Sequence, residues 1–233
     1  MSVFAIGDLH LPGHEQKPMD VFGSHWDRHF ETISEKWRQK IKDEDIVLIP
    51  GDISWAMQLS EATDDLHAIA QLPGTKLLLR GNHDYWWSSL SKLRAALPES
   101  MHVIQNDAMR FGDRVFCGTR GWNFPVPQQN LSAQDEKVYL RELVRLRMSL
   151  DQACKLGGED ITVMLHFPPL FADGIGTAFT EILEEYKVQR VVYGHLHGAG
   201  IKIGFEGTRN GIAYHLVSCD ALGFDPVCII SEE

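Results

Sequence analysis

Five short polar clusters occur in order along this chain of 233 residues, and their residue types bind metal ions. They are Asp8-Leu9-His10, Gly51-Asp52, Gly81-Asn82-His83-Asp84, the single His166, and Gly194-His195-Leu196-His197. Carboxylate, imidazole and amide groups suit transition metals such as Mn, Fe or Zn better than Ca. Two such ions about 3.5–4 Å apart can hold the attacking and leaving oxygens of an in-line displacement. The clusters therefore predict a two-metal site for phosphoester hydrolysis.

Each cluster follows an apolar run that predicts a buried strand. The runs are Val3–Ile6, Ile46–Ile49, Lys76–Leu79, Ile161–Leu165 and Arg190–Tyr193. Ligands of open α/β sheets collect at the carboxyl ends of the strands, so clusters far apart in sequence can converge there. Residues two apart on an extended chain point the same way. Asp8 and His10 can therefore share one metal, and His195 and His197 stand in the same relation, with each imidazole able to reach a different ion.

Segments whose apolar residues have helical spacing lie between these strands. It predicts helices at Trp26–Lys42, Ser60–Gln71, Ser88–Leu97, Ser132–Leu156 and near Ala178–Tyr186. The strand–helix alternation implies a mainly parallel sheet with right-handed crossovers. Short segments spaced like hairpins predict that a second sheet begins in the middle of the chain. These are His102–Gln105, Ala108–Phe111 and Arg114–Cys117, and further strands are expected at Ile201–Phe205, Ile212–Leu216 and Val227–Ile230.

The ordered set D-x-H, G-D, G-N-H-D, H and G-H-x-H resembles the calcineurin-like metallophosphoesterase superfamily, and it extends from residue 8 to residue 197. A single motif of this kind is weak evidence, but all five in order after strand-like runs are specific. The resemblance implies an α/β fold, a four-layer αββα sandwich of two mixed β-sheets flanked by helices. We expect one such domain over residues 1–233.

The resemblance also implies a role for each matching residue. Asp8, His10 and His197 would hold one metal, and Asn82, His166 and His195 the other. Asp52 would bridge two divalent or trivalent transition-metal ions, which would share the attacking hydroxide. His83 would lie beside them and stabilise the phosphoryl charge or protonate the leaving oxygen. Asp84 would orient His83 and raise its basicity.

Several residues near the clusters are candidates for substrate contact. Trp55 and Trp122 lie in loops, where they can either line a pocket or pack. Arg120 could grip a phosphate with two hydrogen bonds, and Arg80 could do the same or pair with a carboxylate. His14 and His25 follow the first cluster, where they either face the substrate or lie on the surface.

Composition limits the classes of partner. The formal net charge of −10 argues against binding of long nucleic acid, which requires a basic stripe, but it permits a small phosphorylated substrate. Four cysteines without a C-x-x-C pair indicate a reducing compartment. Because neither a signal peptide nor a membrane span is evident, we expect a cytoplasmic protein. The oligomeric state is not indicated.

These observations favour a metal-dependent phosphoesterase that hydrolyses a phosphomonoester or phosphodiester of a small or medium-sized molecule. The family's protein phosphatases carry G-N-H-E and an Arg-Gly after the second motif, whereas this chain has G-N-H-D and Ile53-Ser54-Trp55-Ala56. The pattern instead resembles cyclic-nucleotide phosphodiesterases and other small bacterial-type phosphohydrolases. A nuclease is an alternative. A non-catalytic scaffold is another, but some scaffolds of the superfamily have lost ligands, and here all seven are present.

Overall fold

Two stacked β-sheets form the centre of the structure, a computed structural model that describes residues 1–13, 19–126, 131–157 and 160–232. The first sheet has the order β11-β1-β2-β3-β4. Strands β1 to β4 are parallel, and β11 pairs antiparallel with β1. The strands are β1 (Val3–Ala5), β2 (Ile46–Pro50), β3 (Thr75–Leu79), β4 (Met101–Ile104) and β11 (Val227–Ile230).

The second sheet has the order β5-β6-β7-β8-β10-β9. Its four central strands are parallel, whereas the edge strands β5 and β9 are antiparallel to their neighbours. The strands are β5 (Ala108–Phe111), β6 (Arg114–Thr119), β7 (Asp160–Leu165), β8 (Arg190–Tyr193), β9 (Gly207–Arg209) and β10 (Ile212–Leu216). The central strands are buried on both faces, which explains their apolar runs.

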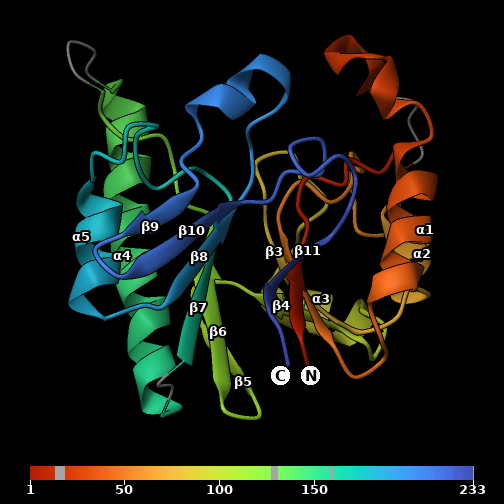
Figure 1. The fold of residues 1–233 in the computed structure, drawn as a ribbon, viewed down its shortest axis with the longest axis horizontal. Helices are drawn as coiled ribbons and strands as arrows, with labels where there is room; N and C mark the ends of the chain where they lie inside the picture. The colour runs from red at the N-terminus through yellow and green to blue at the C-terminus, as the bar shows by residue number, and fades with distance from the viewer. Residues whose placement is uncertain (14–18, 127–130, 158–159, 233) are drawn as a thin grey trace.

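Helices cover the outer face of each sheet (Figure 1). The first sheet packs against α1 (His29–Lys40), α2 (Thr63–Ala70) and α3 (Leu90–Ala96), and the second against α4 (Ala133–Lys155) and α5 (Ala178–Glu185). Three 3-10 helices complete the described elements: η1 (Met19–Phe22), η2 (Ser24–Trp26) and η3 (Gly198–Ile203). Between the sheets, Val3 and Leu48 pack in one apolar cluster with Phe116, Met164 and Val192. The expected four-layer αββα sandwich is therefore confirmed.

Three expectations about elements were wrong. The helix expected from Trp26 begins at His29, because Arg28 has a left-handed backbone with φ of 49° that ends the helical path. The segment expected to open the second sheet is β4, which pairs in parallel with β3 after the crossover helix α3. The strand expected at Ile201–Phe205 is largely the 3-10 helix η3. Apolar residues predict burial in each case, but they do not specify the hydrogen-bond partner.

No helix among the described residues is both long enough and apolar enough to cross a membrane.

Candidate metal centre

The polar clusters meet at the carboxyl ends of parallel strands from both sheets. Asp8 and Asp52 follow β1 and β2, and the G-N-H-D cluster follows β3. His166 follows β7, and His195 follows β8. This edge lies opposite the chain termini in Figure 1. The two sheets thus bring the seven expected ligand residues into one region.

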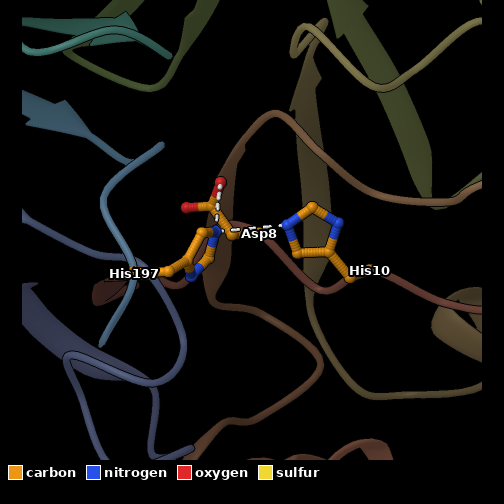
Figure 2. A group of neighbouring side chains, drawn as sticks. All are labelled: Asp8, His10 and His197. Atoms are coloured by element: carbon orange, nitrogen blue, oxygen red, sulfur yellow. Dashed lines mark hydrogen bonds and ion pairs between the residues drawn. The ribbon is translucent and has the colours of Figure 1, made fainter. Parts of the chain in front are cut away.

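Asp8, His10 and His197 form the first group of ligand atoms. Figure 2 shows their side chains pointing toward one another, and one ligand atom from each lies within 4.8 Å of the others. His10 Nε2 is 3.2 Å from His197 Nε2, which is 3.7 Å from Asp8 Oδ1. Metal–ligand bonds of about 2.0–2.2 Å place the ligand atoms of one ion roughly 3–3.5 Å apart. The spacing of this group therefore suits one ion.

Asn82, His166 and His195 form the second group. Asn82 Oδ1 lies 2.7 Å from His166 Nε2 and 2.9 Å from His195 Nδ1, and the two nitrogens are 3.3 Å apart. Asp52 lies between the groups, because its Oδ2 is 3.5 Å from His166 Nε2 and 3.8 Å from His10 Nε2. One carboxylate is thus near both sets of atoms.

In His166 and His197, hydrogen bonds at Nδ1 leave Nε2 available to bind a metal ion. His166 Nδ1 lies 2.9 Å from the carbonyl oxygen of Pro50, and His197 Nδ1 lies 2.9 Å from Asp220 Oδ1. A carbonyl or carboxylate oxygen only accepts, so Nδ1 of each ring carries the proton. The lone pair of each Nε2 then faces the centre, which is the arrangement that outer partners impose on metal-binding histidines.

Burial shifts the protonation equilibria of the candidate ligands toward the neutral forms of their carboxyl and imidazole groups. Burial raises the pKa of Asp8 to about 8 and also raises that of Asp52, and mutual repulsion adds to the effect on Asp8. Burial lowers the pKa of His10 and lowers those of His166 and His195 to about 3, so these rings are neutral ligands. Buried carboxyl groups beside neutral imidazoles form a donor set whose carboxylates divalent cations would neutralise. The residues therefore fit metal ions.

Four of the seven residues have a left-handed backbone: φ is 57° at Asp8, 44° at His10, 50° at Asp52 and 75° at His195. The extended-chain alternation expected for Asp8 and His10 was therefore wrong, although the two side chains do converge. Such conformations cost about 1–3 kcal/mol each and persist only where the surroundings impose them. Here the Asp8 amide donates to the Gly51 carbonyl oxygen at 2.9 Å, and the His10 amide donates to the Asp52 carbonyl oxygen at 2.9 Å.

Two glycines allow the carboxylates to approach the backbone closely. A Cβ atom on Gly81 would overlap the Asp52 carboxylate, and one on Gly194 would overlap the Asp8 carboxylate. Side chains at these positions would displace a candidate ligand, which explains why glycine precedes the ligands there.

Asp84 connects the second and third clusters. Its carboxylate accepts hydrogen bonds from the amides of Gly81, Ile53 and Ser54 at 2.7, 2.8 and 3.2 Å, and from Trp86 Nε1 at 3.0 Å. These donors are the described partners of the carboxylate, and the His83 ring is not among them. Asp84 is thus placed to hold two loops together, whereas we expected it to orient the His83 ring.

His83 is half-buried beside the two ligand groups. Its ring lies 4.5 Å from that of Trp55, which in turn stacks on His10 at 4.8 Å. The amide of His83 donates to Asp52 Oδ1 at 2.8 Å. Trp55 thus packs against both rings, which is the packing role of the two alternatives considered for it.

The other candidates for substrate contact lie in different surroundings. Trp122 lines a pocket with His195, and the Arg120 guanidinium lies 4.6 Å above its ring. Arg80 and Arg120 line a separate small cavity. His25 is exposed, and His14 lies outside the described residues.

Asp220 is a site residue that the sequence reading missed. Its Oδ2 accepts from the Gly198 amide at 2.9 Å, while Oδ1 accepts from His197. The hydrogen bond from His197 helps to lower the pKa of Asp220 although burial raises it, so the carboxylate stays charged. The available signal was the position of Asp220 shortly after the strand-like run Ile212–Leu216.

We expect the metal-free protein to lose stability as the pH rises from about 6.5 to about 8. Burial raises the folded-state pKa of Asp8 to about 8 and of Asp84 to about 7, so their stabilisation is present at low pH and lost on deprotonation. The opposite effect of His166 and His195, whose pKa values are lowered from 6.5, is exerted mostly below pH 6.5 and is the smaller effect over this interval. Denaturant unfolding with a chelator at both pH values measures the change.

Added Mn should reverse this trend, because metal binding favours deprotonated ligands and strengthens with pH. A chelated protein whose free energy of unfolding rises over this interval would contradict the assignment of the buried carboxyl groups.

Comparisons with known proteins agree with this fold. The family model for calcineurin-like phosphoesterases matches residues 1–199. The gene 66 protein of Mycobacterium phage D29 is 27% identical over 203 residues, which cover 86% of this chain and 81% of that protein. The chain belongs to the calcineurin-like phosphoesterase family, whose members are metal-dependent.

Two solved structures share the fold at low identity. A phosphopantetheinyl hydrolase from Mycobacterium tuberculosis aligns with a TM-score of 0.58 and 15% identity, over 93% of this chain and 88% of the other. A protein of unknown function from Aquifex aeolicus aligns with a TM-score of 0.50 and 14% identity, over 97% and 94%. At these identities the likeness supports the fold alone.

Proposed function

We propose that this protein is a dinuclear metal-dependent phosphohydrolase that acts on a phosphomonoester or phosphodiester of a small or medium-sized organic molecule. The observation that carries the proposal is the position of Asp52 between two groups of ligand atoms, 3.8 Å from His10 Nε2 and 3.5 Å from His166 Nε2. A carboxylate in that position suits two ions rather than one.

Each ion has its own set of candidate ligands. Asp8, His10 and His197 would hold one ion, Asn82, His166 and His195 would hold the other, and Asp52 would contact both. Bound there, the ions would supply the Lewis acidity that activates water and neutralises phosphoryl charge. The Nδ1 hydrogen bonds of His166 and His197 orient their rings for this purpose.

His83 is the proposed proton donor of the protein itself. Its ring lies 5.9 Å from that of His10, and the contact with Trp55 limits its rotation. A half-buried imidazole of this kind can give a proton to the leaving oxygen. The hydrogen bond from its backbone amide to Asp52 Oδ1 fixes the backbone of His83 next to the central carboxylate.

The substrate size follows from a cavity of about 800 Å³ beside His195. Its wall includes Trp122, Phe124, Phe171 and Leu196. Cavities of roughly 300–1,000 Å³ with apolar walls bind small organic molecules. We infer that this cavity holds the organic part of the phosphoester, and the net charge of −10 argues against a long nucleic acid.

We expect about two transition-metal ions per chain, as for other two-metal hydrolases. Elemental analysis of protein purified without chelator and then reconstituted with Mn measures this content. A reproducible value near zero after reconstitution would rule out the metal centre, and a value near one would rule out the dinuclear site.

The activity itself is tested by screening the Mn-loaded protein against phosphomonoesters, phosphodiesters and cyclic nucleotides. We expect hydrolysis of at least one class, and its loss on addition of chelator. A metal-loaded, folded protein that hydrolyses none of them would favour the non-catalytic scaffold.

A further inference from the structure

A small cavity lined by arginines lies at the carboxyl ends of strands from both sheets. It has a volume of about 100 Å³ and is lined by Arg80 after β3, Arg120 after β6 and Arg145 on α4. Among the described residues that line it, Glu142 is the single carboxylate. Three guanidinium groups and one carboxylate leave two formal positive charges, in a protein whose net charge is −10.

Both carboxylate oxygens of Glu142 accept hydrogen bonds from groups other than Arg80 and Arg120. Glu142 is fully buried, and its Oε1 accepts from Arg145 Nη1 at 2.5 Å. Its Oε2 accepts from Thr119 Oγ1 at 2.5 Å and from the Gly121 amide at 3.3 Å. The carboxylate therefore fixes the wall of the cavity.

The other two arginines have unused donors. Arg80 Nε is buried and has no hydrogen-bond partner in the described part of the chain. Arg120 stacks on the Trp122 ring through the face of its guanidinium group, and this side chain has no hydrogen bond to another described residue. Burial lowers the pKa of Arg120, attraction to Glu142 opposes this effect, and repulsion from Arg80, Arg145 and Arg141 adds to it. The buried Arg80 Nε can donate to an acceptor that enters the cavity.

We propose that this cavity binds a tetrahedral oxyanion, and that the anion is a second phosphate group of the substrate. The volume equals that of about three water molecules at ~30 Å³ each, which suits a phosphate rather than an organic group. Guanidinium groups bind phosphate through paired hydrogen bonds. The source of the anion rests on the proposed function, but anion binding as such does not.

The cavity is coupled to the metal centre through the backbone. The carbonyl oxygen of Arg120 accepts from the amides of His166 and Phe167, both at 3.0 Å. Arg80 is two residues before Asn82. Two of the arginines thus adjoin candidate ligands along the backbone, and a substrate with two phosphate groups would contact both the ligands and the cavity.

The test uses three variants of the full chain. Arg80→Gln and Arg145→Gln each remove one charge from the cavity, and Arg80→Gln breaks no described hydrogen bond of Arg80 Nε. Arg147→Gln is the matched control, because Arg147 lies on the same helix and pairs at 2.7 Å with the exposed Glu185. Thermal unfolding of each variant establishes that it is folded.

The first measurement is calorimetric titration with inorganic phosphate and with sulfate, with Mn bound and with a chelator present. We expect binding to persist with the chelator, to weaken at least tenfold in Arg80→Gln and Arg145→Gln, and to be unchanged in Arg147→Gln. Absence of chelator-resistant binding, or equal binding by all folded variants, would overturn the oxyanion site.

The second measurement identifies the source of the anion. It compares kcat/KM of the Mn-loaded protein for adenosine 3′,5′-bisphosphate and for adenosine 5′-monophosphate. We expect a preference for the bisphosphate that falls at least tenfold in the two cavity variants and persists in the control. No preference, or one that the variants retain, would overturn the assignment to a substrate phosphate. If neither nucleotide nor any other phosphoester is hydrolysed, the proposed function fails, and the titration still decides the anion site.

Discussion

Replacement of Asp52 by asparagine is expected to lower phosphoester hydrolysis by several orders of magnitude. Asparagine preserves the shape and can still accept the hydrogen bond that the His83 amide donates at 2.8 Å. It removes the negative charge that lies between His10 and His166 and would neutralise both ions. The measurement is kcat/KM of the reconstituted variant, together with its metal content, which should fall for at least one ion.

Asp113→Asn is a suitable control, since Asp113 is an exposed carboxylate in the β5–β6 turn. It should retain full activity and metal content. Near-normal turnover of Asp52→Asn would mean that Asp52 serves only the turn after β2.

Replacement of His83 by alanine should separate proton transfer from metal binding. General acids and bases typically contribute about 10²–10⁴-fold, so kcat should fall by that order on a diester with a poor leaving group. The loss should be much smaller on a nitrophenyl phosphodiester, whose leaving oxygen needs no proton. Metal content should remain complete, because the His83 ring belongs to neither group of ligand atoms.

His67→Ala provides the matched control, because His67 is an exposed histidine on α2. It should change neither reaction. An equal loss on both esters, or loss of metal from His83→Ala, would indicate that His83 is structural or a ligand.

The sequence by itself predicted that the candidate ligands lie at the carboxyl ends of the strands. Asp8, Asp52, Asn82, His166 and His195 each follow a buried apolar run, and the parallel order of those strands places their ends at one edge. Both signals are local, because a strand between two packed layers needs apolar residues throughout and the ligand residues follow it directly. The ordered motifs indicated the family by resemblance, and that resemblance implied the αββα sandwich, whereas the local signals alone predicted only an α/β fold.

The tertiary structure alone decided which distant groups became partners. Strand β4 joined the first sheet although its sequence suited a hairpin, because an apolar strand does not encode its neighbour. The left-handed backbone at Asp8 depends on the Gly51 carbonyl across the sheet, and the orientation of His197 depends on Asp220. Likewise, Arg80, Arg120 and Arg145 are far apart in sequence, and only the packing of α4 against the strand ends encloses them in one cavity. Residue type determines what chemistry a group can perform, whereas long-range hydrogen bonds and burial determine which groups perform it together.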